Sequence, residues 1–246
     1  MPRMPLLLVA CAPLAWPQIS SLPSRESLSY TIEWRLITAG KAHIDWSAKT
    51  PARNGYDLKL RLESAGLVSK FFKVEDDYSV SLTRELCAQS SFMDSTEGRR
   101  HHDTRVTFDY ETRKAAYLER DLARNNAVLG QQEVEIPACV HDIAGGLYFL
   151  RTLRLEPGQH TQAPVSDGKK SVMAGVEGQQ REEIKTPAGT FKTVRYEVFL
   201  FNNVLYRRSA HAYVWLTDDA RRLPVQVRVR MQFTIGTITM QLDKVP

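Results

Sequence analysis

Short runs of alternating apolar and polar residues recur along most of this chain. The clearest information comes from residues 211–231, HAYVWLTDDARRLPVQVRVRM, where Val227 and Val229 would face one way while Arg228 and Arg230 face the other. An alternation with a period of two is typical of a β-strand that has one buried and one solvated face. The segment therefore predicts a β-hairpin, and it constrains the fold more than any other feature.

The same pattern predicts about twelve strands at the spacing of an antiparallel meander. A sheet of that length accumulates twist and cannot stay flat. We therefore predict a mainly β fold, in which a single curled antiparallel sheet forms a barrel-like or sandwich-like domain. In the hairpin above, Asp218 and Asp219 are interpreted as turn residues, because a calcium site needs more oxygen ligands than the local sequence supplies.

One segment departs from the alternation. Over about residues 142–153 the apolar side chains recur at helical spacing, and Asp142 is suited to cap the first turn. We expect this helix to cover the sheet. Gly145 and Gly146 disfavour a helix interior, so they indicate a close approach to another backbone.

A shorter apolar segment, GLVSKFFK at residues 66–73, is expected to form one turn or a bend. Its side chains Leu67, Val68, Phe71 and Phe72 are expected to be covered by the rest of the fold.

The first residues predict export. Arg3 precedes an apolar stretch that ends at Trp16, which is too short for the roughly 20 residues of a spanning helix. We interpret residues 1–16 as a signal peptide, residues 17–27 as a linker and residues 28–246 as a single β-rich domain. The predicted location is the periplasm or the outer membrane of a bacterium.

Two kinds of processing fit this leader. Leu8-Val9-Ala10-Cys11 resembles a lipobox, in which Cys11 would become the lipid-anchored first residue. Cleavage without lipidation, at Ala10-Cys11-Ala12 or near Ala15, is the alternative.

In an oxidising compartment the remaining cysteines, Cys87 and Cys139, form an even pair. A disulfide between them is the first interpretation, and two unpaired buried thiols are the alternative.

Several segments, taken in their order and spacing, resemble an exported bacterial family, the domain of unknown function family 3108. The resemblance rests on residues 28–30, 40–42, 66–70, 108–110, 140–143, 147–151, 187–191 and 215–225. It implies an exported all-β domain and brings no established activity or catalytic residue.

Residues with catalytic or metal-binding chemistry form no recognised motif. Adjacent positions of His101-His102-Asp103 would face opposite sides of a strand, so the two imidazoles would not hold one metal. We expect no catalytic residue, no metal and no cofactor, and therefore no enzyme. The net charge of +5 comes from 33 basic and 28 acidic residues without a long basic run, which argues against nucleic acid as a partner.

The function we predict is noncovalent binding of an apolar or amphipathic ligand, such as a lipid, within the curved sheet. A continuous apolar cavity of roughly several hundred Å³ would favour this function. Envelope scaffolding without a small-molecule ligand is the alternative, and a hydrolase comes third. The candidate ligand-binding residues are Tyr30, Trp34, Trp46, Phe149 and Trp215.

Basic side chains offer a second candidate surface. Arg228 and Arg230 share one strand face, and Arg207 or Arg208 from a neighbouring segment could extend it into a patch suited to phosphate or carboxylate. An anionic envelope component would be the partner of such a patch, and an ordinary solvated face is the alternative.

Overall fold

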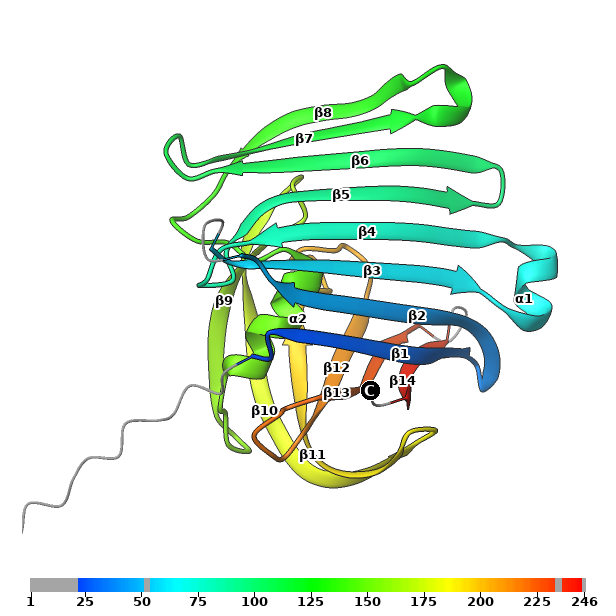
Figure 1. The fold of residues 1–246 in the computed structure, drawn as a ribbon, viewed down its shortest axis with the longest axis vertical. Helices are drawn as coiled ribbons and strands as arrows, with labels where there is room; N and C mark the ends of the chain where they lie inside the picture. The colour runs from blue at the N-terminus through cyan, green and yellow to red at the C-terminus, as the bar shows by residue number, and fades with distance from the viewer. Residues whose placement is uncertain (1–21, 51–53, 233–235, 245–246) are drawn as a thin grey trace, which may run out of the picture.

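The computed structural model describes residues 22–50, 54–232 and 236–244. These residues form one antiparallel sheet of fourteen strands together with two α-helices (Figure 1). The mainly β, curled-sheet prediction is confirmed. The strands are β1 (Arg25–Trp34), β2 (Ile37–Ala48), β3 (Tyr56–Ser64), β4 (Val74–Leu82), β5 (Ala88–Glu97), β6 (Arg100–Asp109), β7 (Lys114–Asp121), β8 (Ala127–Glu135), β9 (His160–Ser166), β10 (Ser171–Thr186), β11 (Gly189–Phe199), β12 (Ala210–Thr217), β13 (Pro224–Met231) and β14 (Thr237–Lys244).

The sheet consists of two meanders that meet at β1. Strands β1 to β8 follow one another, and the chain then passes through helix α2 (Ile143–Thr152) before strands β9 to β14 follow in order. Strand β14 pairs with β1, so the first and last strands join the two meanders. Strands β8 and β9 are the two edges, so the ladder of backbone hydrogen bonds does not close into a full barrel.

The turn between β9 and β10 brings the two edges together. Lys169 Nζ lies 3.1 Å from Glu119 Oε2 of β7, and its carbonyl accepts a 2.8 Å hydrogen bond from Gln132 of β8. Gly168 fits here because a Cβ atom at that position would lie 2.6 Å from a methyl carbon of Val106. Side-chain contacts therefore complete the curl where strand pairing stops.

Helix α2 covers one end of the sheet, as predicted. Asp142 caps the helix, because its carboxylate accepts hydrogen bonds from the backbone amides of Ala144 and Gly145. The close approach to another backbone that we expected at the two glycines is not found. A Cβ atom at Gly145 would meet the side chains of Asp142 and Leu82, and one at Gly146 would meet nothing within 4 Å.

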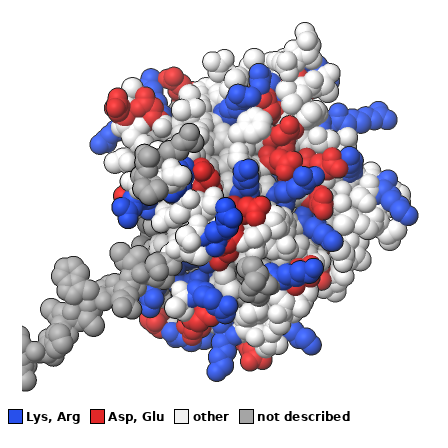
Figure 2. Space-filling model, in the orientation of Figure 1, with Lys and Arg blue, Asp and Glu red and all other residues white. Residues whose placement is uncertain are grey.

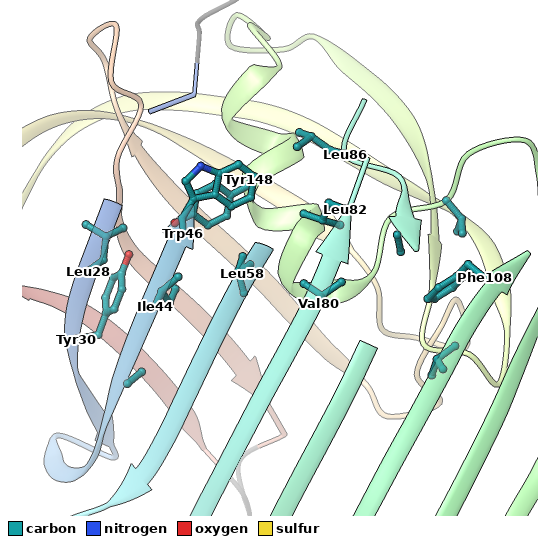
Figure 3. Packing of buried hydrophobic residues seen from close by; sticks show 14 of the residues in the cluster. Leu28, Tyr30, Ile44, Trp46, Leu58, Val80, Leu82, Leu86, Phe108 and Tyr148 are labelled. Atoms are coloured by element: carbon teal, nitrogen blue, oxygen red, sulfur yellow. The ribbon is translucent and has the colours of Figure 1, made fainter. Parts of the chain in front are cut away.

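The main core lies between α2 and the sheet (Figure 3). Trp46 is stacked between Tyr148 of α2, at 4.1 Å between ring centroids, and Tyr56 of β3, at 4.5 Å. We call the end of the sheet that carries this stack, next to α2, the α2 end. Aromatic and aliphatic burial is therefore concentrated there.

Two elements differ from the sequence prediction. We expected about twelve strands, and β8 and β14 were not among them. Every residue of β8 is exposed or only partly buried, so its sequence carries no clear alternation. Helix α1 (Gly66–Phe71) is the single turn expected for this segment, but none of its residues is buried. The expectation that the apolar side chains of α1 would be covered was therefore wrong.

The chain begins its first strand earlier than predicted. β1 starts at Arg25, so Arg25 to Ser27 belong to the sheet and not to a linker. The predicted signal peptide, Cys11 and the first part of the linker lie outside the described residues. Within the described part, no helix is long and apolar enough to span a bilayer.

Candidate ligand-binding cavity

A cavity of about 540 Å³ lies inside the curl, between α2 and the concave face of the sheet. Both meanders contribute to its wall, and so does the loop between β11 and β12. Its apolar lining includes Leu60, Leu62, Met93, Val106, Leu147, Phe149, Leu150, Val176, Val198, Tyr206, Val214, Val227, Val229 and Met240.

Strand alternation explains why these side chains face inward. Val227 and Val229 of β13 line the cavity, while Arg228 between them lies with its guanidinium over the ring of Trp215, 5.1 Å from the ring centroid. In β3, Leu60 and Leu62 line the cavity in the same way. The valine and arginine faces of residues 225–231 are thus opposite faces of one strand, as the hairpin pattern predicted.

Helix α2 is held against the sheet by a buried ion pair. Arg151 is 1% exposed, and its two terminal nitrogens donate to the two carboxylate oxygens of Glu26 at 2.5 and 3.0 Å. Tyr148 adds a 3.1 Å hydrogen bond to the same carboxylate, and Arg222 donates to the carbonyl of Arg151 at 2.8 Å. These bonds attach the helix to β1 and to the turn after β12. The part of the cavity wall that α2 forms is therefore firmly held in place.

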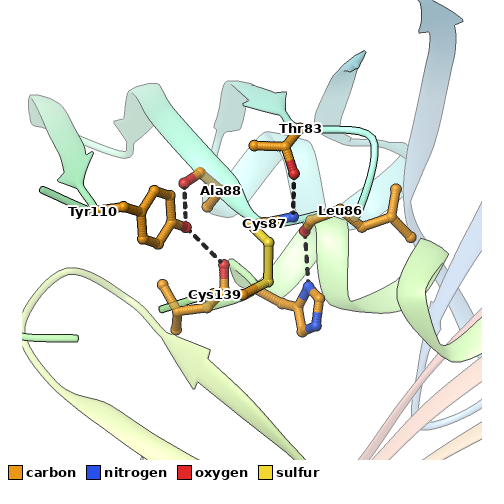
Figure 4. The surroundings of a disulfide bond; sticks show 8 residues. Thr83, Leu86, Cys87, Ala88, Tyr110 and Cys139 are labelled. Carbon is orange, nitrogen blue, oxygen red and sulfur yellow. Dashed lines mark hydrogen bonds between the residues drawn. A yellow bond between two sulfur atoms is a disulfide. The ribbon is translucent and has the colours of Figure 1, made fainter. Parts of the chain in front are cut away.

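The disulfide between Cys87 and Cys139 fixes the chain just before this helix, with 5.1 Å between the two Cα atoms (Figure 4). It joins the β4–β5 turn to the segment that enters α2. Beside it, Ala88 donates a backbone hydrogen bond to Val140 at 2.8 Å, and Tyr110 donates to the carbonyl of Ala88 at 2.6 Å. The position of α2 is therefore set from its N-terminal side as well.

Polar groups on the cavity wall are occupied by protein partners. Tyr78 donates a 2.8 Å hydrogen bond to Asp142, and Ser95 donates one of 2.6 Å to Asp76. Burial raises the pKa of Asp142 and that of Asp76, because loss of water disfavours the charged carboxylate. Burial also lowers the pKa of His141, which favours its neutral form.

No lysine or arginine is among the described residues that line the cavity. An anionic group placed inside would therefore meet carboxyl groups without a compensating cation. The arrangement suits an apolar guest, or the apolar part of an amphipathic one.

The five aromatic residues singled out from the sequence occupy different places. Phe149 lines the cavity and stacks on His141, with 3.9 Å between ring centroids. Tyr30 donates to the carbonyl of Pro224 in the packed core, where Trp46 also lies.

Trp215 and Trp34 lie away from the cavity lining. Trp215 donates from its ring nitrogen to Glu182 at 2.8 Å, on the face of β12 that also carries Tyr213. Trp34 is partly exposed at the end of β1. Most of the lining residues that sequence reasoning missed are aliphatic, and Tyr78, Phe201 and Tyr206 were missed as well. The signal for those on strands was the inward phase of the alternation and not the size of a ring.

The basic residues singled out from the sequence lie on two elements. Arg228 and Arg230 belong to β13, where Arg230 pairs in register with His211. Arg207 and Arg208 are exposed in the loop between β11 and β12. Charged side chains of both signs are interleaved over the face of the molecule seen in Figure 2.

The histidine pair lies on β6, and each imidazole has an acidic neighbour. His101 contacts Asp94 at 2.8 Å, and His102 contacts Glu119 at 3.4 Å. Within residues 22–50, 54–232 and 236–244, no three His, Cys, Asp or Glu side chains are grouped so that they could hold a metal ion.

Solved structures that align with this chain come from bacteria. A β-barrel-like protein of domain of unknown function DUF1849 from Brucella abortus aligns with a TM-score of 0.57 and 7% identity over 92% of this chain and 98% of its own. A protein from Bacteroides fragilis with a YmcC-like fold, provisionally described as exported, aligns with a TM-score of 0.39 and 9% identity over 92% and 97%. At 7% identity, the first likeness shows a shared barrel-like fold alone.

A third structure, provisionally described as a lipoprotein of Parabacteroides distasonis, aligns with a TM-score of 0.32 and 9% identity over 92% of this chain and 97% of its own. No match was found among curated proteins. The family model described as protein of unknown function DUF3108 matches residues 29–243, which is nearly all of the described chain. This confirms the resemblance seen in the sequence, and the chain belongs to the DUF3108 family.

Proposed function

We propose that this protein binds an apolar or amphipathic ligand, such as a lipid, with the apolar part of the ligand inside the curled sheet. The observation that supports the proposal is the cavity of about 540 Å³ with its predominantly aliphatic and aromatic wall. Its volume falls within the roughly 300–1,000 Å³ of small-molecule sites in proteins. Each methylene group that moves from water into such a site contributes about 0.8 kcal/mol.

The polar groups of the wall limit the chemistry of the ligand. Asp76 and Asp142 are buried, and their carboxyl groups already accept hydrogen bonds from Ser95 and from Tyr78. Because no cation lines the described cavity, the charged head of an anionic lipid would lie outside it. We therefore expect the cavity to receive acyl chains or comparable hydrocarbon.

Mass spectrometry of the native protein, purified from its own envelope and extracted for lipids, would test the proposal. We expect a co-purifying lipid. A quantitative companion is titration of the full chain with the apolar fluorescent probe N-phenyl-1-naphthylamine, which should show saturable binding. Repeated absence of both signals would contradict the proposal.

A cavity-filling variant gives a matched comparison. Ala212 lies on the cavity wall, so Ala212→Phe should occupy part of the space and weaken probe binding about tenfold. Ala116 of β7 is exposed, so Ala116→Phe adds the same side chain outside the cavity and should leave binding unchanged. Equal binding by the two variants would place the probe elsewhere.

A further inference from the structure

The end of the sheet opposite α2 displays apolar side chains to solvent. The β1–β2 turn and helix α1 lie side by side there, and we call this region the α1 rim (Figure 1). Leu36 is 93% exposed, Phe71 88% and Leu67 66%. The apolar residues of the α1 rim are Trp34, Leu36, Ile37, Leu67, Phe71 and Phe72.

The β1–β2 turn is an unfavourable place for a leucine. Arg35 and Leu36 are its two central residues, and both have left-handed backbone conformations, with φ of 49° and 69°. Two-residue hairpin turns with positive φ at both positions strongly favour Asn-Gly, because a Cβ atom is crowded there. Turn formation therefore does not account for Leu36, and its side chain is presented to the outside on a strained backbone.

Helix α1 presents its side chains on a fixed backbone. Ala65, just before the helix, donates a hydrogen bond to the carbonyl of Ala39 at 2.9 Å, and Phe72 donates to Val68 at 2.8 Å. After the helix, Gly98 of the β5–β6 turn donates to the carbonyl of Lys73 at 2.7 Å. The exposure of Leu67 and Phe71 is thus built into the fold.

Basic side chains lie beside these apolar residues. Arg35 lies over the ring of Trp34 at 5.4 Å, and Lys73 pairs with Glu75 at 3.0 Å. In the part of the chain that the structure describes, no acidic side chain forms an ion pair with Lys70 of α1 or Arg99 of the β5–β6 turn. Lys and Arg side chains project along this edge of the molecule (Figure 2).

We propose that the α1 rim docks onto the surface of an anionic lipid bilayer. Apolar side chains that project from a rigid scaffold, with cations beside them, match the boundary between acyl chains and acidic headgroups. Leu36 and Phe71 would enter the acyl boundary, while Lys70 and Arg99 would contact the headgroups. The proposal stands on the exposed residues alone and holds whether or not the cavity binds a ligand.

The cavity wall extends toward the α1 rim. Leu62 lines it near the end of β3, and Asp76 lines it near the start of β4, and α1 connects these two strands. A bilayer on the α1 rim would therefore face the cavity from the end that α2 leaves uncovered.

Sedimentation of the full chain with lipid vesicles tests the docking. We expect binding to vesicles of phosphatidylcholine mixed with phosphatidylglycerol, and weaker binding to phosphatidylcholine alone. Leu36→Asn combined with Phe71→Ser should lower the apparent affinity about tenfold or more, because two large apolar side chains no longer leave water. Lys70→Glu combined with Arg99→Glu should weaken binding and reduce its dependence on salt.

Matched controls separate this surface from the rest of the molecule. Met173 of β10 is also exposed, so Met173→Ser should bind vesicles as the unchanged chain does. The Leu36→Asn/Phe71→Ser variant should still bind N-phenyl-1-naphthylamine in solution, since neither residue lines the cavity. Failure of the probe experiment would thus concern the cavity and not the rim.

Two results would overturn the proposal. One is a full chain that does not sediment with phosphatidylglycerol vesicles, in which case a protein partner becomes the better explanation of the exposed rim. The other is a Leu36→Asn/Phe71→Ser variant that sediments as well as the unchanged chain, which would place membrane contact outside the rim.

Discussion

The two ends of the curled sheet use aromatic and charged residues in opposite ways. At the α2 end, Trp46 and Tyr148 stack in the core and Arg151 forms a buried ion pair with Glu26. At the α1 rim, Phe71 and Leu36 are in water. The α2 end therefore holds the structure together, whereas the α1 rim contributes little to folding and leaves apolar surface available for contact.

The largest loss of stability should come from the ion pair of the α2 end. Arg151→Met leaves the Glu26 carboxylate buried without its cation, which typically costs roughly 3–5 kcal/mol. Urea unfolding measures this loss directly. The double variant Glu26→Leu/Arg151→Met, which removes both charges, should lose less than the single variant. A single variant within about 1 kcal/mol of the unchanged protein would break the contrast between the two ends.

The disulfide should follow in size. Cys87 and Cys139 are 52 residues apart, and replacing both with alanine removes a link that restricts the unfolded chain. The expected loss is roughly 2–4 kcal/mol. The measurement is thermal or urea unfolding of the Cys87→Ala/Cys139→Ala variant, beside the unchanged protein with and without reductant. If reductant destabilises the alanine variant too, its effect does not act through this bond.

At the α1 rim a substitution should stabilise the fold. Leu36→Gly relieves the left-handed strain of the turn, and we expect a gain of up to about 1 kcal/mol after the added entropy of the unfolded glycine is counted. Phe71→Ser should change stability by no more than about 0.5 kcal/mol, since Phe71 is exposed. Paired melting curves check both values. A clear destabilisation by Leu36→Gly would show that the leucine side chain supports the fold.

The sequence predicted the packed end better than the exposed one. The capping role of Asp142 followed from its place before an apolar helical segment, and the pairing of Cys87 with Cys139 followed from their even number. Strand alternation likewise predicted the opposite faces of Val227 and Arg228. These features depend on local patterns or on counting, which a single sequence contains.

The cavity and the α1 rim could not be predicted in the same way. An inward position such as Leu60 or Met93 looks the same in sequence whether its side chain meets another one or an empty space. The apolar residues of α1 suggested burial, because hydrophobic side chains usually find cover in the fold. Helix α1 lies instead at the end of the sheet opposite α2, and Phe71 is exposed there.

The smallest expected effect concerns Asp76, which lies on the cavity wall between the two ends. Because burial raises the pKa of this carboxyl group, its folded form binds a proton more readily than its unfolded form. Ionised Asp76 therefore costs stability above its folded pKa, and this cost disappears as the pH falls toward the ordinary aspartate pKa of about 4. The Asp76→Asn variant carries no such charge.

Melting temperatures of Asp76→Asn and the unchanged protein should accordingly differ most near neutral pH, with the variant the more stable. The gap should narrow steadily in acid, because both proteins then carry an uncharged group at this position. Asp142, whose pKa is also raised by burial, is present in both proteins and cancels from the difference. A gap that stays constant with pH would mean that the variant acts through packing or the Ser95 hydrogen bond. In that case ionisation of Asp76 would not lower the stability of the folded protein.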